Sequence, residues 1–401
     1  MKAILALAGL AACCWWAAPV LAAPGTAGAA YLPRTGDQVL ETLRATPGDP
    51  AVRELRAWQA KRAAEPTNVL VACEVARRCV ERSRHDADPR YLGRAQAALA
   101  PWWDAPAAPV EVLILRATLR QSQHDFIRAL ADLDLAAGLA PRNPQVWLTR
   151  VTILTLQGEY AAARRACGPL AQLAPGLISL TAASGIATLN GDAERACARL
   201  RGALAGAGTA GAGERVWALT VLAEAETRAG RFVEAEADFQ RALNLAPRDP
   251  YLLGAYADLL LDLGRPREAV QLIGAEPRAD GLLLRLAIAE AALTPPPATF
   301  VAHAAGLRAR FEAGRLRGDF VHQREEARYL LEVAGDPRAA LPVARANWDV
   351  QREPADARLL LAAARGAGDP AAAAPVLDFV RTNRLEDTVL ARWAGQLSPN
   401  Q

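Results

Sequence analysis

The side chains that most often perform catalysis or bind metals are sparse in this chain and lie far apart. Its four histidines are His85, His124, His303 and His322. No two of them are three or four residues apart, the spacing that places a pair of ligands on one face of a helix. We therefore expect no metal site, and we assign these histidines to exposed or hydrogen-bonded structural positions.

The sequence also lacks the short motifs that accompany common reactions. It contains no G-x4-G-K-[ST] phosphate loop, no G-x-S-x-G nucleophile elbow and no H-E-x-x-H helix. Neighbouring carboxylates, such as Glu224 with Glu226 or Glu325 with Glu326, have the spacing of charges on a helix surface. We therefore predict that the protein is not an enzyme and uses no cofactor.

The dominant feature of the sequence is a pattern that returns every 34 residues. Copies begin at positions 110, 144, 216 and 250. In the copy from Val216 to Pro247, apolar residues three and four apart form one helix face, and Gly230 ends that helix. Small and large side chains then alternate along a second helix. This period and pattern predict stacked pairs of antiparallel helices.

The pattern resembles the tetratricopeptide repeat, whose consensus is W-x2-L-G-x2-Y, then A-x3-F, then P. The copy that opens at position 144 places Trp147, Gly158 and Tyr160 in the corresponding slots, whereas His124 replaces the turn glycine of the preceding copy. The copy near position 178 has lost its aromatic residues. The resemblance covers about residues 67–383 and implies an all-α solenoid of stacked helix pairs that forms a right-handed superhelix.

The remaining segments are arranged around this array. In chain order we predict a signal peptide at 1–22, a flexible leader at 23–35, N-terminal capping helices at 36–66 (helical at 36–45 and 50–64), the repeat array at 67–383, and a C-terminal capping helix and tail at 384–401. The repeat register breaks near 201–213, which is rich in Gly and Ala, and near 294–298, which is rich in Pro. We expect loops at both breaks.

The N-terminus has the composition of an export signal. Lys2 precedes the apolar residues 3–18, which are too few to span a bilayer comfortably, and small residues favour cleavage after Ala22 or Ala23. We therefore expect a periplasmic protein of a Gram-negative bacterium. The residues that end at Cys13 also resemble a lipobox, and lipidation of Cys13 would instead make the protein an outer-membrane lipoprotein with a structural or assembly role.

Composition argues against nucleic acid as a partner. The formal net charge is only +3, and Lys2 and Lys61 are the only lysines, every other basic residue being arginine. The arginines alternate with acidic residues, which is typical of solvated helix faces and not of a phosphate-binding stripe.

The cysteines of the array allow two interpretations. Cys73 and Cys79 lie six apart on one predicted helix, about 9 Å along its axis, which is too far for a disulfide. Cys167 and Cys197 fall on the second helices of successive repeats. They either pair with each other or remain buried free thiols.

The resemblance implies a binding surface along the first helices of the repeats, which form the concave face. The residues that we assign to partner binding on this face are Gln145, Thr152, Trp217, Glu224, Tyr251, Asp258, His322, Glu325 and Tyr329. This surface is polar, aromatic and mildly acidic, without an evident basic clamp for a C-terminal carboxylate. We expect a non-catalytic scaffold or adaptor of the cell envelope that binds a protein or peptide. A solenoid that binds a carbohydrate or small ligand is the alternative.

Trp102 and Trp103 are the other conspicuous aromatic residues. They lie between two alanine–proline pairs in the stretch 100–106. Either they fill the junction between early repeats, or they form an exposed aromatic platform for a peptide or sugar.

Overall fold

The computed structural model describes residues 49–274, 277, 279–318 and 321–397. The predicted signal peptide, its lipidation site Cys13, the leader and the predicted helix at 36–45 lie outside these residues. Within the described part, all regular secondary structure is helical. None of the described helices is both long enough and apolar enough to cross a membrane.

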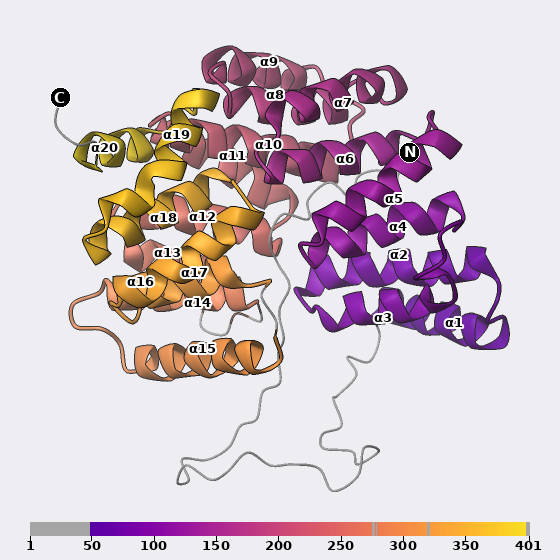
Figure 1. Cartoon of the computed structure of the whole chain (residues 1–401), viewed down its shortest axis with the longest axis horizontal. Helices are drawn as coiled ribbons and strands as arrows, with labels where there is room; N and C mark the ends of the chain where they lie inside the picture. The colour runs from indigo at the N-terminus through magenta and orange to yellow at the C-terminus, as the bar shows by residue number, and fades with distance from the viewer. Residues whose placement is uncertain (1–48, 275–276, 278, 319–320, 398–401) are drawn as a thin grey trace, which may run out of the picture.

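The first nine α-helices rise through one side of the molecule and cross its top in Figure 1. They are α1 (Pro50–Ala64), α2 (Val69–Asp86), α3 (Arg90–Ala98), α4 (Val110–Ser122), α5 (Phe126–Leu139), α6 (Pro144–Leu156), α7 (Tyr160–Leu173), α8 (Leu177–Thr188) and α9 (Ala193–Ala205). A short 3-10 helix (Ala100–Trp102) separates α3 from α4. Helix α1 has the bounds predicted for the second capping segment.

The remaining helices descend and then return. They are α10 (Ala212–Arg228), α11 (Phe232–Leu245), α12 (Pro250–Asp262), α13 (Pro266–Ile273), α14 (Asp280–Ala291), α15 (Thr299–Leu316), α16 (Gln323–Glu332), α17 (Pro337–Val350), α18 (Pro354–Ala367), α19 (Ala374–Asn383) and α20 (Thr388–Leu397). A second 3-10 helix (Pro370–Ala373) precedes α19. The stretch predicted as a loop at 201–213 is non-helical only at 206–211, because α9 and α10 both extend into it.

Successive helices pack as antiparallel pairs, and their turns explain the 34-residue pattern. Gly158, Gly230 and Gly264 follow the first helices of their pairs with φ of 75°, 75° and 66°. This left-handed conformation disfavours residues with a Cβ, so the turns predicted at these glycines are confirmed. His124 occupies the same turn position with φ of 57°. At the next helix start, Asp249 caps α12 and Pro250 is its first residue.

The core of the array lies between the paired helices. In α11, Ala235, Phe239 and Ala242 are all buried, and they pack against α10 and α12 in one cluster. The small residues let the helix backbones approach, while the phenylalanine fills the space between pairs. The four cysteines of the described part, Cys73, Cys79, Cys167 and Cys197, are free thiols. The interpretation of Cys167 and Cys197 as free thiols therefore holds in this structure.

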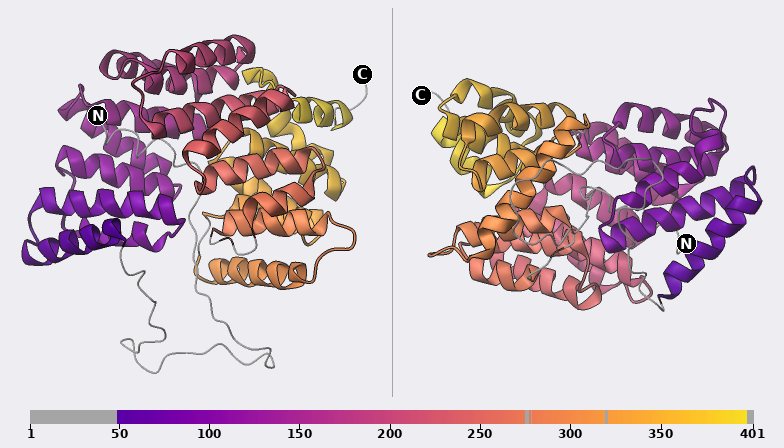
Figure 2. Two further views of the ribbon diagram at one scale, coloured as in Figure 1. Left: turned by 180° about the vertical axis from the view of Figure 1, so that it is seen from behind. Right: turned by 90° about the horizontal axis from the view of Figure 1, so that it is seen from below.

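The chain reverses direction after α15, and this reversal decides the shape of the molecule. Helices α16–α20 run back alongside the descending helices α10–α14, as the two views in Figure 2 and the front view in Figure 1 show. We call residues 321–397, which contain α16–α20, the C-terminal layer. This layer lies over the concave side of the middle repeats, so their first helices face it across a partly open cavity.

One edge of the C-terminal layer packs on the turns of the array through apolar contacts. The ring of Phe379 lies 5.2 Å from that of Trp348, edge to face, and 5.9 Å from that of Tyr160 in α7. A Cβ on Gly158 would lie 2.6 Å from the Phe379 ring, so only glycine fits this contact. The backbone N–H of Arg352 also donates to the carbonyl of Leu156 (2.8 Å). We call this contact the apolar attachment.

Candidate functional site

A cavity of about 880 Å³ lies between the concave face of the middle repeats and the C-terminal layer. Its walls come from α6, α8, α10, α12 and α14 on the side of the array, and from α16, α18 and α20 on the side of the layer. We call this cavity the chamber. Its lining combines aromatic and aliphatic side chains with carboxylates and guanidinium groups.

The structure brings most of the predicted partner-binding residues to this chamber. Those that line it are Thr152, Trp217, Glu224, Tyr251, Asp258 and Glu325. They come from α6, α10, α12 and α16, and the repeat period places the residues of the array on one face.

Three predicted residues lie elsewhere. Gln145 is 7% exposed, and its side-chain amide donates to Thr149 Oγ1 (3.0 Å) within α6. Tyr329 is buried, with its ring 5.5 Å from that of Phe311 in α15. His322 is the residue before α16. The ring contact between Phe311 of α15 and Tyr329 of α16 therefore buries a side chain that we expected to line the binding surface.

Glu224 and Tyr251 form a direct hydrogen bond in the chamber. The Tyr251 hydroxyl donates to Glu224 Oε1 at 2.6 Å and so links α10 to α12. Burial raises the pKa of Glu224 above its usual range, although the hydrogen bond from Tyr251 and the charge of Arg228 oppose this shift. Burial and the neighbouring Glu224 also raise the pKa of Tyr251 well above its ordinary value.

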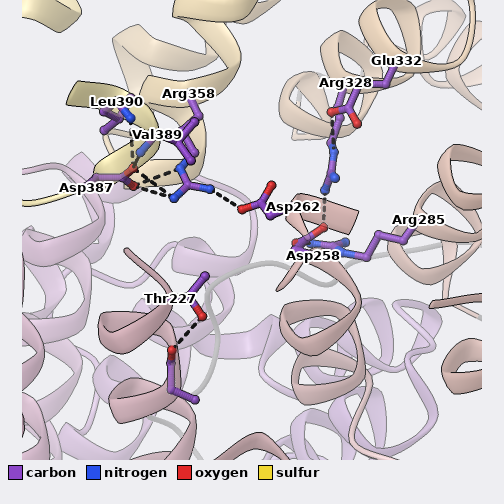
Figure 3. Close-up of polar contacts among 11 residues, drawn as sticks. Thr227, Asp258, Asp262, Arg285, Arg328, Glu332, Arg358, Asp387, Val389 and Leu390 are labelled. Atoms are coloured by element: carbon purple, nitrogen blue, oxygen red, sulfur yellow. Dashed lines mark hydrogen bonds and ion pairs between the residues drawn. The ribbon is translucent and has the colours of Figure 1, made fainter. Parts of the chain in front are cut away.

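Asp258 is the centre of an arginine network that joins the array to the C-terminal layer (Figure 3). It accepts from Arg285 of α14 at 2.6 Å and from Arg328 of α16 at 2.7 Å, and Arg328 also donates to Glu332 at 2.8 Å. Burial disfavours the charged form of Asp258, but the two guanidinium groups outweigh it and hold its pKa below the usual value. The carboxylate is 34% exposed because it faces the chamber.

A second arginine bridge lies beside the first. Arg358 of α18 donates to Asp262 of α12 at 2.7 Å and to both carboxylate oxygens of Asp387 at 2.9 and 3.0 Å. Asp387 also accepts the backbone N–H groups of Val389 and Leu390, which caps α20 (Figure 3). We call the contacts of Arg328 and Arg358 with α12 the charged attachment of the C-terminal layer.

The arginines of the chamber are the residues that sequence reasoning missed. Arg324, Arg328 and Arg358 all belong to the C-terminal layer, and Arg324 binds Glu353 and Asp356 of α18 at 2.5 and 2.5–2.6 Å. The spacing of Arg324, Arg328 and Glu332 does mark one charged face of α16. Nothing in the local pattern says that this face meets α12, because that contact depends on the reversal after α15.

Trp102 and Trp103 lie at the junction of the early repeats, half-buried against the core of α2–α5. Their backbone carbonyls accept from Arg116 Nη1 at 2.8 and 2.7 Å, and Arg116 is itself paired with Asp132. The guanidinium of Arg120 lies 5.6 Å from the Trp103 ring. This geometry favours the interpretation in which both residues fill a junction.

No group of His, Cys, Asp and Glu side chains in the described part of the chain is arranged to hold a metal ion. Asp258, Asp262 and Asp387 are instead engaged by arginines, and Glu224 by a tyrosine hydroxyl, as described above. These contacts indicate a polar binding surface and supply no assembled nucleophile and base.

Comparison with known families matches one part of the array. Residues 226–282, which span α11, α12 and α13, match the family model of the tetratricopeptide repeat. No curated protein matches the sequence.

Solved structures with stacked helix pairs are similar at low identity. One is a tetratricopeptide repeat protein from Parabacteroides merdae, at 17% identity over 65% of this chain and 93% of that chain, with a TM-score of 0.39. Another is a chain of the APC/C hetero-tetramer Cut9-Hcn1, at 10% identity over 88% of this chain and 85% of that chain, with a TM-score of 0.40.

The matched residues include α12, the first helix of its pair, whose side chains Tyr251 and Asp258 line the chamber. Tetratricopeptide repeats generally bind proteins or peptides, and their fold suggests a protein-interaction scaffold. The predicted all-α solenoid is confirmed by the helix pairs themselves. The chain therefore contains tetratricopeptide repeats, matched in sequence at residues 226–282, within an all-α solenoid.

Proposed function

We propose that this chain is a non-catalytic scaffold of the bacterial cell envelope that binds an extended segment of a partner protein in its chamber. The observation that carries the proposal is the convergence of Trp217, Glu224, Tyr251 and Asp258 on one cavity of about 880 Å³. Binding cavities of about 300–1,000 Å³ with apolar walls and a few placed polar groups are typical of ligand sites. A folded domain does not fit this volume, whereas a short extended segment does.

The chemistry of the chamber supports binding over catalysis. Asp258 and Asp262 are held in ion pairs between helices, and the aromatic residues Trp217 and Trp393 lie on opposite walls, in α10 and α20. Aromatic side chains in partly desolvated pockets carry a large share of binding energy at protein interfaces. Trp217 and Tyr251 are therefore the side chains on which we expect a bound segment to depend most.

A peptide selection tests this proposal. Random peptides displayed on phage would be selected on the purified protein, and the best would be synthesised and titrated by calorimetry. Replacing Trp217 and Tyr251 together by alanine should weaken binding more than tenfold, because such anchors contribute about 2 kcal/mol or more each. Replacing the exposed pair Arg164 and Arg165 by alanine is the control and should change little. Unchanged binding by the aromatic variant, with its helical circular dichroism intact, would contradict the proposal.

The enclosure of the chamber favours a second candidate, a carbohydrate or other small ligand. Trp217 and Tyr251 would then stack on the ligand while Asp258 and Arg285 hydrogen-bond to it. An array of mono- and oligosaccharides tests this candidate. Saturable binding to a sugar that competes with the selected peptides would favour it, and the absence of any sugar binding would remove it.

Placement in the envelope rests on the N-terminal residues. Cleavage after Ala22 or Ala23 would release the protein into the periplasm, whereas lipidation at Cys13 would anchor it to a membrane. The intact mass of the protein purified from its native host separates these outcomes. A chain that begins at Ala23 or Pro24 supports the periplasmic placement, and the mass of a lipidated chain that begins at Cys13 would replace it.

A further inference from the structure

Glu224 differs from the other carboxylates that the array contributes to the chamber. On α12, Asp258 and Asp262 each accept a hydrogen bond from an arginine of the C-terminal layer. Glu224 accepts only from the neutral hydroxyl of Tyr251, at 2.6 Å. Among the residues that the structure describes, no arginine or lysine forms an ion pair with it. Its second carboxylate oxygen is therefore available to a ligand in the chamber.

The charges around Glu224 favour a cation at this place. Glu353 of α18 and Asp258 of α12 both act on Glu224 as like charges, against one opposite charge from Arg228, one turn further along α10. Arg228 itself donates to Thr188 Oγ1 at 3.1 Å and makes no ion pair in the described part of the chain. Asp258 and Glu353 are paired with Arg285, Arg328 and Arg324, so Glu224 is the carboxylate that a positive group of a ligand can reach. Burial strengthens that attraction because the surroundings screen it less than water does.

The wall beside Glu224 suits a cation on an apolar stem. Val221 and Trp217, about one and two turns before Glu224 on α10, line the same chamber. Lysine and arginine side chains pack their methylene stems along apolar surface while the charged end reaches a carboxylate. An indole ring also attracts a nearby cation.

We propose that Glu224 receives the amine or guanidinium group of a bound segment, so that the chamber selects a partner with a lysine or arginine side chain. This inference rests on the proposed function, because it names the chemistry of the segment that the scaffold binds. Tyr251 keeps the carboxylate in place, and Val221 and Trp217 contact the stem of the cationic side chain.

The proposal predicts a pH dependence with a defined sign. Burial raises the pKa of Glu224 in the free protein, so part of the population is protonated where an ordinary glutamate is ionised. Only the carboxylate pairs with a cation. Cation binding should therefore strengthen as the pH rises through this pKa, and it should release protons below it. Arg228, Tyr251, Asp258 and Glu353 act on Glu224 in both states and shift the position of this transition.

The test uses two small probes that differ only in charge. Butylguanidinium carries the cation of an arginine side chain, and butylurea is its neutral counterpart of the same shape. Each would be titrated into the wild type, Glu224→Gln and Glu332→Gln by ligand-detected NMR at several pH values. Glu332 is the matched control, because it also lines the chamber but is already paired with Arg328.

We expect the wild type and Glu332→Gln to prefer butylguanidinium by about tenfold, the usual gain from a charged hydrogen bond. Glu224→Gln should bind both probes equally. The same preference in Glu224→Gln, no preference in the wild type, or no binding of either probe would overturn the inference.

The outcome is separable from that of the proposed function. Selected peptides that bind the chamber without lysine or arginine, and whose affinity is unchanged in Glu224→Gln, would overturn this inference while the scaffold function stands. Failure to select any chamber-binding peptide would overturn the scaffold function.

Discussion

The C-terminal layer is held to the rest of the molecule in two physically different ways. At the apolar attachment, Phe379, supported by Trp348 of the same layer, packs on Tyr160 of the array and contacts the turn at Gly158. At the charged attachment, Arg328 and Arg358 reach carboxylates that remain about one-third exposed to the chamber. The chamber lies between these two contacts.

The difference assigns separate roles to the two attachments. Burial of aromatic surface stabilises by several kcal/mol and depends little on salt. Partly exposed ion pairs stabilise by about 0–1 kcal/mol each and are screened by salt. We therefore conclude that the apolar attachment determines whether the layer folds onto the array, whereas the charged attachment orients α16 and α18 and sets the polarity of the chamber.

The largest effect should come from the buried side chain that supports Phe379 within the C-terminal layer. Trp348 is 4% exposed, and Trp348→Ala removes a buried indole and its edge-to-face contact with Phe379. We expect a loss of about 3–5 kcal/mol in the free energy of unfolding, with early exposure of α17–α19. Urea denaturation and hydrogen exchange measure the two effects. A loss below about 1 kcal/mol would mean that Trp348 does not support Phe379 at the apolar attachment.

A pair of glycine substitutions isolates the contribution of the closing contact. Gly158→Ala and Gly264→Ala both place a Cβ in a left-handed turn, at φ of 75° and 66°. A Cβ on Gly264 meets nothing within 4 Å, whereas one on Gly158 meets the Phe379 ring.

Gly264→Ala should therefore lose only the backbone term, about 1–2 kcal/mol, and Gly158→Ala should lose roughly 1–3 kcal/mol more through overpacking. Urea melts of both variants measure the difference. Equal losses at the two turns would show that Phe379 does not press on Gly158 in solution.

Acid should destabilise the fold through two histidines. Burial and the charge of Arg324 lower the pKa of His124 to about 4, and burial and His124 lower that of His322. The unfolded chain takes up these protons near pH 6.5. Stability is therefore fully present above pH 6.5 and falls as the pH approaches 4, by about 1–2 kcal/mol for His124 at pH 5.

His124→Gly tests this dependence, because glycine suits the left-handed turn and does not titrate. Unfolding midpoints at pH 7.5 and pH 5 should differ less in this variant than in the wild type. An unchanged difference would assign the acid sensitivity to other groups.

The smallest effect should come from the charged attachment. Asp262→Asn keeps the shape of the side chain and removes one partner of Arg358, which remains paired with Asp387. We expect a change of about 0–1 kcal/mol that shrinks as salt is added. Urea melts at low and high salt measure it. A loss as large as that of Trp348→Ala would remove the distinction between the two attachments.

Sequence periodicity predicts the array well because each repeat specifies its own turns and core. The glycine turns at Gly158 and Gly230 and the convergence of Trp217, Tyr251 and Asp258 all follow from a fixed period of 34 residues. These features depend only on contacts between neighbouring helices.

The second wall of the chamber does not follow from that period. It arises because the chain turns back after α15, so that Arg328 and Arg358 meet α12, from which they are separated by 70 and 96 residues. The 34-residue pattern contains no information about contacts between residues so far apart in the sequence. The open, arginine-poor concave face that we expected from the repeats is therefore a lined chamber in the structure.

The central claim is that the C-terminal layer covers this concave face and restricts access to the chamber between them, and size-selective thiol labelling tests it most directly. Thr227 lines the chamber, and Thr227→Cys places a small thiol there. Arg164→Cys, at an exposed site outside the chamber, is the matched control, and the unsubstituted chain gives the background of the native thiols. The rates of modification by iodoacetamide and by a maleimide coupled to polyethylene glycol would be compared. The polymer, of about 5 kDa, is far larger than a typical ligand cavity. We predict that both reagents modify the control, whereas only iodoacetamide modifies Thr227→Cys at a comparable rate. Equal modification of Thr227→Cys by the large reagent would show an open groove and contradict the account.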